Sequence, residues 1–227
     1  MPIQKISTLR QFLSLPFQSE AVFDKFSELP GALDFPDGNG ARFLYVPGNA
    51  GRPLLCAHAD VYAPYGMPLE EDDERFFRAC DLLGADDRAG CAILWMLRHT
   101  KCPMLIFDGE ERGLLASSRF CREMAELGAC LRKKSPFVLS FDLAGSGEWK
   151  HYGCASVEFQ TKISRILGKA PLTPAGATDA ALLGKLFQWD VCNLSVGFHH
   201  AHTTNEFLGK SDFLAAMDYS EKIIDFF

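Results

Sequence analysis

The sequence lacks the features that mark several large classes of protein. No apolar stretch in its 227 residues approaches the roughly 20 residues needed to cross a membrane, and no internal repeat or low-complexity tract is present. Basic residues are outnumbered, because 23 Lys and Arg stand against 29 Asp and Glu, for a formal net charge of −6. An acidic chain is a poor candidate for binding nucleic acid or an anionic membrane surface, so we expect neither partner.

The eight cysteines include no C-x-x-C pair, which argues against a zinc ribbon or a thioredoxin-type motif. Several of them, such as Cys56 and Cys91, lie in apolar runs, where a free cysteine behaves as a small hydrophobic residue. Residues 1–15 have no long apolar core after Lys5 and Arg10, so they do not resemble a signal peptide. We therefore expect a cytoplasmic protein in a reducing compartment.

Common catalytic and binding motifs are also absent or incomplete. The sequence contains neither the H-E-x-x-H motif of many zinc proteases nor the G-x-S-x-G turn of many serine hydrolases. Gly209, Lys210 and Ser211 resemble the end of a phosphate-binding loop, but Thr204 stands where that motif needs a glycine. Asn193 begins an N-x-S tripeptide, yet it lies in an apolar segment of a chain without a secretion signal, so we dismiss glycosylation.

What is present is the pattern of one globular domain over residues 1–227, with 48% hydrophobic and 23% charged residues. Short apolar runs typical of buried strands alternate with helical patterns. We predict strands at 42–46, 52–57, 103–107, 136–141 and 191–196. We predict helices at 9–29 (one or two), 87–99, 113–127, 157–167, 179–187 and 213–227. This alternation predicts an α/β fold of three α/β/α layers around a mostly parallel central sheet.

Histidine and acidic side chains follow the predicted strands at the points where they end. Because ligands of open α/β sheets bind beyond the carboxyl ends of the strands, we expect these side chains to meet in one place. The set is His58, Asp60, Asp86, Glu110, Glu111, Asp142 and His202. Imidazole and carboxylate groups suit zinc.

A charge count is consistent with two zinc ions. Asp86, Glu111 and Asp142 carry −3 and two zinc ions carry +4, so one hydroxide, the nucleophile of a two-metal hydrolase, would balance the remaining +1. Glu110 would then be free to act as a base beside that water.

These segments resemble, in order, the signature of the cocatalytic zinc exopeptidases, which include tripeptidases, glutamate carboxypeptidases, aminoacylases and zinc aminopeptidases. The segments that carry the resemblance are HAD at 58–60, GADDRAG at 84–90, EERG at 110–113, Asp142 and HTTNE at 202–206. GATDA at 176–180 also resembles a G-x-(S/T)-D-(A/G) segment of that superfamily. The likeness spans about residues 42–226 and implies the zinc-exopeptidase-like (phosphorylase/hydrolase-like) fold.

The resemblance implies a role for each residue. Asp86 bridges two metal ions, which are zinc, or cobalt or manganese as alternatives. His58 and Asp142 complete one site, and Glu111 and His202 complete the other. Glu110 is the general base that activates a metal-bridging hydroxide, and Asp60 orients the imidazole of His58. The resemblance also implies a cis peptide bond after Asp86.

Several assignments stay open at this point. Asp87 could replace Asp86 as the bridging residue, although the place two residues before Arg88 favours Asp86. His200 is either a substrate or oxyanion contact or an ordinary loop residue. Asp179 is either an acid at the start of a helix or a support for the metal site. Ala201 stands where related aminopeptidases often have an oxyanion-binding tyrosine, so carbonyl polarisation would depend mainly on the metals.

Many relatives carry an inserted lid domain at the position between Asp142 and Gly176, where this chain has only the 33 residues 143–175. We therefore expect a single catalytic domain without a lid, for which the lidless zinc aminopeptidases are the nearer model. The predicted function is a metallo-exopeptidase, an aminopeptidase or dipeptidase acting on small peptides. The alternatives are a deacylase of N-acyl amino acids and a metal-binding homologue without turnover. The sequence does not predict the oligomeric state.

Overall fold

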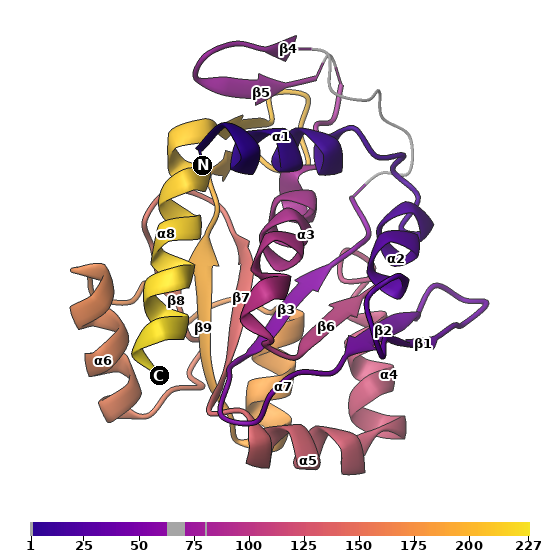
Figure 1. The fold of residues 1–227 in the computed structure, drawn as a ribbon, viewed down its shortest axis with the longest axis vertical. Coiled ribbons are helices and arrows are strands. Elements are labelled where there is room, and N and C mark those ends of the chain that lie inside the picture. Colours follow the sequence, from indigo (N-terminus) through magenta and orange to yellow (C-terminus); the bar gives the residue numbers. More distant parts are fainter. Residues whose placement is uncertain (1, 63–70, 80) are drawn as a thin grey trace.

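A computed structural model describes residues 2–62, 71–79 and 81–227 of the chain (Figure 1). The helices are α1 (Pro2–Leu13), α2 (Glu20–Ser27), α3 (Ala85–Leu97), α4 (Leu115–Glu123), α5 (Ala125–Lys134), α6 (Val157–Leu167), α7 (Asp179–Phe187) and α8 (Lys210–Phe226). A 3₁₀ turn, η1 (Arg98–Thr100), follows α3. The strands are β1 (Leu33–Phe35), β2 (Phe43–Val46), β3 (Leu54–His58), β4 (Glu71–Asp72), β5 (Phe76–Arg78), β6 (Met104–Phe107), β7 (Phe137–Leu143), β8 (Trp149–Lys150), β9 (Asp190–Ser195), β10 (Phe198–His199) and β11 (Phe207–Gly209).

The central sheet has the strand order β1-β2-β6-β3-β7-β9-β8. Its four middle strands, β6, β3, β7 and β9, are parallel, with Leu55 opposite Met104 and Leu54 opposite Val138. The outer strands β1, β2 and β8 run antiparallel to their neighbours. The predicted, mostly parallel sheet is therefore confirmed for the strands that lead to the candidate site.

Two hydrophobic layers cover the sheet because alternate residues of each strand point to opposite faces. In β3, Leu55 and Ala57 belong to one buried cluster, whereas Leu54 and Cys56 belong to the other. Helices α1, α2, α3, α6 and α8 contribute to the first cluster, and α4, α5 and α7 to the second. Figure 1 shows the sheet between these helical layers, which confirms the predicted three-layer architecture.

Helix α6 shows how the local sequence sets an element of this fold. Ser156 caps the helix, since its hydroxyl oxygen accepts the Phe159 N–H at 3.2 Å. The helix ends at Gly168, whose φ of 69° lies in the left-handed region that glycine tolerates. Between these signals, Phe159, Ile163 and Leu167 recur every four residues and form the buried face. Residues 143–175 thus contribute β8 to the central sheet and α6 to its helical layer.

The structure corrects some predicted elements. The helix predicted over 113–127 is two helices, α4 and α5, which are separated at Met124, where φ is −117°. A second sheet with the order β10-β11-β5-β4 was not predicted. Its strands are two or three residues long, and Phe77, Phe198 and Leu208 anchor it in the core.

The described structure bears on two features of the sequence, its cysteines and its lack of long apolar stretches. The seven cysteines of the described segments are all free thiols, and Cys80 lies outside the described residues. Within residues 2–62, 71–79 and 81–227, no helix combines the length and the apolar character that a membrane span needs.

Candidate metal centre

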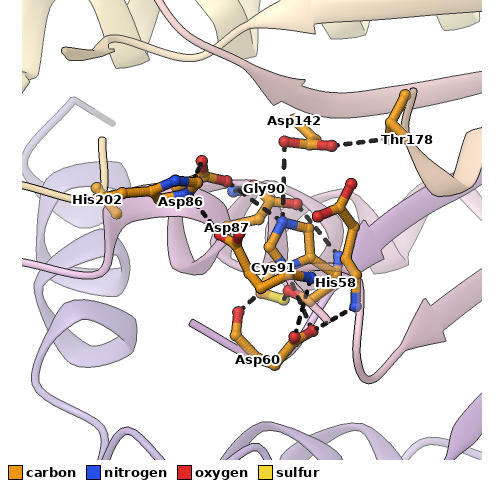
Figure 2. A network of polar contacts seen from close by, with 12 residues as sticks. His58, Asp60, Asp86, Asp87, Gly90, Cys91, Asp142, Thr178 and His202 are labelled. Carbon is orange, nitrogen blue, oxygen red and sulfur yellow. Dashed lines mark hydrogen bonds and ion pairs between the residues drawn. The ribbon is translucent and has the colours of Figure 1, made fainter. Parts of the chain in front are cut away.

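The predicted side chains meet at the carboxyl edge of the central sheet (Figure 2). His58 is the last residue of β3 and Asp142 lies near the end of β7, while Glu110 and Glu111 follow β6. Asp86 lies in the first turn of α3, and His202 follows β10 in the loop toward β11. The ends of neighbouring parallel strands and the start of α3 therefore lie close together. They bring together residues as far apart in sequence as His58 and His202, which are 144 positions apart.

Asp86 lies between the two histidines. Its Oδ1 atom is 3.2 Å from Nε2 of His58, and its Oδ2 atom is 3.2 Å from Nε2 of His202. On the His58 side, Asp142 Oδ1 lies 3.8 Å from Nε2 of His58. On the other side, Glu111 Oε1 lies 2.6 Å from Nε2 of His202. The arrangement places nitrogen and oxygen donors on both sides of the Asp86 carboxylate, and His58, Asp86 and Glu111 each offer one donor atom within 4.8 Å of the others.

The neighbouring Asp87 faces a different set of atoms. Its carboxylate accepts the His58 N–H at 3.3 Å and the Gly90 N–H at 2.8 Å, and the residue is fully buried. A side chain at position 90 would collide with this carboxylate, because an added Cβ would lie 2.2 Å from Asp87 Oδ1. Of the two aspartates, only Asp86 lies between the histidines, and the Asp86–Asp87 peptide bond is cis.

Glu206 holds the backbone that leads into Asp86. Its carboxylate oxygens accept the N–H groups of Gly84, Ala85 and Asp86 at 2.8, 2.9 and 3.3 Å. The residue is 2% exposed. The sequence marked Glu206 only by its spacing from His202, because nothing local indicates that it reaches a loop 120 residues earlier.

Asp60 contacts both His58 and the segment that carries Glu110 and Glu111. The Nδ1 atom of His58 lies 3.0 Å from the Asp60 main-chain oxygen and 3.4 Å from its carboxylate. The same carboxylate accepts the N–H groups of Glu110 and Glu111 at 3.1 and 3.2 Å. With Nδ1 directed at Asp60, the Nε2 atom of His58 points toward Asp86, as Figure 2 shows.

Asp142 is positioned by two residues whose roles were not predicted. The pairing of β7 with β9 shifts register between Ser140 and Leu143, which leaves the main chain of Asp142 outside the regular ladder. The buried amide of Asn193 replaces the missing bonds, since it accepts the Asp142 N–H at 2.9 Å and donates to its carbonyl at 2.7 Å. Thr178 donates its hydroxyl to Asp142 Oδ2 at 2.7 Å. The sequence feature that could have indicated this role is Asn193, a polar residue within a mostly apolar predicted strand.

The charges of the cluster shift the pKa values of its members. Burial would lower the pKa of His58, but the carboxylates of Asp142, Asp60 and Asp86 raise it well above its ordinary value. Hydrogen bonding to Asp86 and the charge of Glu111 raise the pKa of His202 to about 9. Without a metal ion, the imidazole of His202 would therefore hold a proton at neutral pH, and that proton competes with a metal.

Burial raises the pKa of the two glutamates of the site, whereas in Asp86 and Asp60 the hydrogen bonds to the histidines outweigh burial and lower the pKa. Desolvation and the charges of Asp142 and Asp179 raise the pKa of Glu110 to about 9. Desolvation and the charge of Asp86 raise the pKa of Glu111 to about 7. Several carboxyl groups thus share a partly buried space in which divalent cations would restore their ordinary ionisation. The imidazole and carboxylate donors of this set fit divalent metal ions.

Asp179 is buried next to this cluster, at the start of α7. Its residue is 3% exposed, and neither carboxylate oxygen has a hydrogen-bond partner among the described residues. The nearby Ser117 hydroxyl donates to the Leu114 carbonyl instead, at 3.4 Å. Desolvation and the charges of Asp60 and Asp142 raise the pKa of Asp179 to about 7.

We predict that Asp179 destabilises the metal-free protein as the pH rises. The folded state keeps this carboxyl protonated up to about pH 7, whereas the unfolded chain ionises it near its ordinary value of 3.8. Unfolding is therefore favoured increasingly between pH 4 and 7, by an amount on the order of 2–4 kcal/mol. Asp179→Asn should flatten the fall in unfolding free energy over that range, measured by urea titration. Asp225→Asn, at an exposed site on α8, is the matched control, and equal slopes for both variants would contradict the prediction.

Aromatic and polar residues surround the exposed side of the site. The ring of Tyr62 stacks on the imidazole of His202, with centroids 4.5 Å apart and planes at 9°. A cavity of about 410 Å³ is lined by His200, Arg78 and Phe207, among others. Both alternatives for His200, a substrate contact or a loop residue, remain compatible with this position.

The chain has the fold of aminopeptidases and tripeptidases of known structure, which confirms the expected resemblance at the level of the fold. A tripeptidase from Staphylococcus aureus has a TM-score of 0.71 at 14% identity, over 100% of this chain and 98% of that chain. The aminopeptidase PepT from Bacillus cereus has a TM-score of 0.70 at 15% identity, over 99% and 98%. An aminopeptidase from the archaeon Desulfurococcus kamchatkensis has a TM-score of 0.68 at 12% identity, over 100% and 96%. By sequence, the chain matches no family model and no curated protein.

Proposed function

We propose that the chain is a metal-dependent exopeptidase that hydrolyses small peptides as an aminopeptidase or dipeptidase. The observation that carries the proposal is the position of Asp86, whose two carboxylate oxygens each lie 3.2 Å from a different histidine. The solved proteins that share the fold are named as aminopeptidases and a tripeptidase, which supports a peptide substrate. We place the enzyme in the reducing cytoplasm, consistent with the free thiols of the seven described cysteines.

The proposed ligand sets follow the contacts around Asp86. His58 and Asp142 would hold one ion, Glu111 and His202 would hold the other, and Asp86 would bind both. Imidazole and carboxylate donors favour two zinc ions, with cobalt or manganese as alternatives. Thr178 and Asn193 would fix Asp142 in place, and Asp60 would fix the Nε2 side of His58 toward the ions.

Two bound divalent ions would polarise the scissile carbonyl and lower the pKa of a water molecule beside it. The carboxylate of Glu110 would take a proton from that water as its oxygen bonds to the carbonyl carbon. Glu110 would then give the proton to the departing amine nitrogen as the C–N bond breaks. Asp60 positions this base through its bond to the Glu110 N–H. With Ala201 next to His202, no side chain at that position can assist the carbonyl oxygen.

We further propose that residues 1–227 form one catalytic domain without an inserted lid. In support of this, residues 143–175 supply β8 to the sheet and α6 to its helical layer. Without a lid domain, the substrate would not be enclosed between two domains, and the site would bind the free end of a peptide. The partner we expect is therefore a small peptide.

A substrate panel tests the proposal and its alternatives. Metal-depleted protein is titrated with zinc and assayed with Ala-Ala, Leu-Gly-Gly, their N-acetylated forms and N-acetylmethionine. We expect hydrolysis of the free peptides that rises with the second equivalent of metal. Preference for N-acetylmethionine would instead indicate the deacylase. Binding of two zinc ions with no hydrolysis of any compound would indicate a homologue without turnover.

Tyr62 is predicted to stabilise the metal-binding orientation of His202. The imidazole side chain is 37% exposed, so the flat stack with Tyr62 limits its rotation. A stacked pair of this kind contributes about 0.5–1.5 kcal/mol, or about a 2- to 10-fold effect. Tyr62→Ala should weaken zinc affinity by that factor in a chelator competition, whereas Tyr62→Phe should not. A loss of turnover in Tyr62→Phe with unchanged zinc affinity would show instead that the phenol hydroxyl matters.

A further inference from the structure

A second cavity lies at the far end of helix α3 from Asp86. Trp95 and Met96, near the end of α3, and Met104, the first residue of β6, line it. Asp86 lies nine residues before Trp95, or roughly 14 Å along a helix. Since Met104 begins β6, the cavity lies near the end of the sheet where the parallel strands begin, and the candidate metal centre lies at the other end.

The floor of this cavity is apolar and adaptable. Val46, Cys102, Met104 and Met217 line it and are at most 7% exposed. Its volume of about 710 Å³ falls in the range of small-molecule sites. Three of the six methionines of the chain line it, Met96 among them. Methionine side chains are flexible and polarisable, so such a floor can adjust to the apolar part of a ligand.

The rim of the same cavity carries positive charge, although the protein as a whole has a net charge of −6. Lys5, Arg98 and Lys101 line it, and Glu221 is the one acidic residue among its described lining residues. Glu221 is occupied by Lys5, at 3.1 Å. Two cations, Arg98 and Lys101, therefore remain in excess on one side of the opening.

Arg98 is held at this rim by its neighbours. Its Nη1 atom donates to the Trp95 carbonyl at 2.5 Å, and its guanidinium lies 4.7 Å from the centre of the Trp95 ring. His99 is fixed in the same turn, with Nδ1 2.8 Å from the Met96 carbonyl. A guanidinium already held in place loses less side-chain freedom when it binds an anion.

We propose that this cavity is a second ligand site, which binds a small amphipathic carboxylate. The apolar part of the ligand would lie on the methionine floor, and its carboxylate would bind Arg98 and Lys101. Charge complementarity selects an anion over a cation, and the buried floor selects an apolar body over a fully polar acid. The site does not depend on the metal centre, so it is testable whether or not the proposed hydrolase activity holds.

Trp95 provides a built-in reporter for this site. The other two tryptophans, Trp149 and Trp189, are at most 1% exposed, and their indole N–H groups donate to the carbonyls of Lys169 and Ser135. Only Trp95 lines the cavity. A ligand that enters should therefore change the fluorescence of Trp95, and Trp95→Phe should remove that change while calorimetry still detects binding.

The test compares octanoate with octylammonium and acetate on the full chain. We expect octanoate to bind with saturable fluorescence change, and the other two to bind at least ten times more weakly. Lys101→Gln and Arg98→Glu should each weaken octanoate binding several-fold or more, whereas Lys133→Glu, on α5 across the sheet, should not. If Arg98→Glu fails to fold, Lys101→Gln still decides. Equal binding of octylammonium, binding unaffected by Lys101→Gln, or no octanoate binding to the folded protein would each overturn the proposal.

Discussion

Glu110→Gln is expected to lower peptide hydrolysis by a factor of about 10³ or more while metal content stays at two ions per chain. Glutamine keeps the shape of the side chain, and the main-chain N–H of residue 110 still donates to Asp60. The glutamine amide, however, cannot accept a proton from water. General acid–base groups contribute about 10²–10⁴ to rates, and Glu110 is assigned two such transfers. The measurements are steady-state turnover of Ala-Ala and metal content by elemental analysis.

Two comparisons make the Glu110 result interpretable. Glu123→Gln changes an exposed acid that pairs with Arg119 on α4, and it should leave both turnover and metal content unchanged. Glu110→Asp should recover part of the lost turnover, since it restores the carboxylate at a shorter reach. Wild-type turnover in Glu110→Gln would refute the role of general base, and loss of metal from that variant would show that Glu110 is a ligand.

The elements that the sequence predicts well are those with local signals at both ends. The helices predicted at 157–167 and 179–187 coincide with α6 and α7, because apolar spacing and flanking caps or turns mark them. The strands of the small sheet carry no such signal. β10 and β11 have two or three residues each, and β11 pairs with β5, which is more than 100 residues away in sequence. Only tertiary structure can bring such segments together.

Some residues of the candidate site could likewise be predicted from the sequence, whereas others could not. His58, Asp142 and Glu111 were predicted because each follows a strand of recognisable apolar type, and strand ends converge at one edge of the sheet. Asn193 and Thr178 act on Asp142 through bonds that span 51 and 36 residues. Their roles depend on a register shift between β7 and β9, which no local pattern reports. The sequence therefore predicted the groups around Asp86 and the contact of Asp60 with His58, whereas the roles of Asn193 and Thr178 required the fold.

Asp86→Asn is expected to weaken both metal sites together and to abolish turnover. Each carboxylate oxygen of Asp86 faces a different histidine, so removing its negative charge affects the ions on both sides. His202→Ala, in contrast, should weaken only one site, since its contacts are with Asp86 and Glu111. A two-site calorimetric titration with zinc distinguishes these outcomes. In Asp86→Asn, the zinc affinities of both sites should fall by at least tenfold. In His202→Ala, the zinc affinity of only one site should fall by that much.

The control for this titration is His200→Ala, two residues from His202 in the same loop. Its ring is 5.9 Å from that of Phe207, and none of the donor contacts around Asp86 in the described structure involves it. Both zinc affinities should therefore match the wild type in this variant. If Asp86→Asn instead weakens a single site and leaves the other at wild-type affinity, Asp86 does not bridge the ions. Asp87, which contacts the main chain of His58, would then need to be tested as the shared ligand.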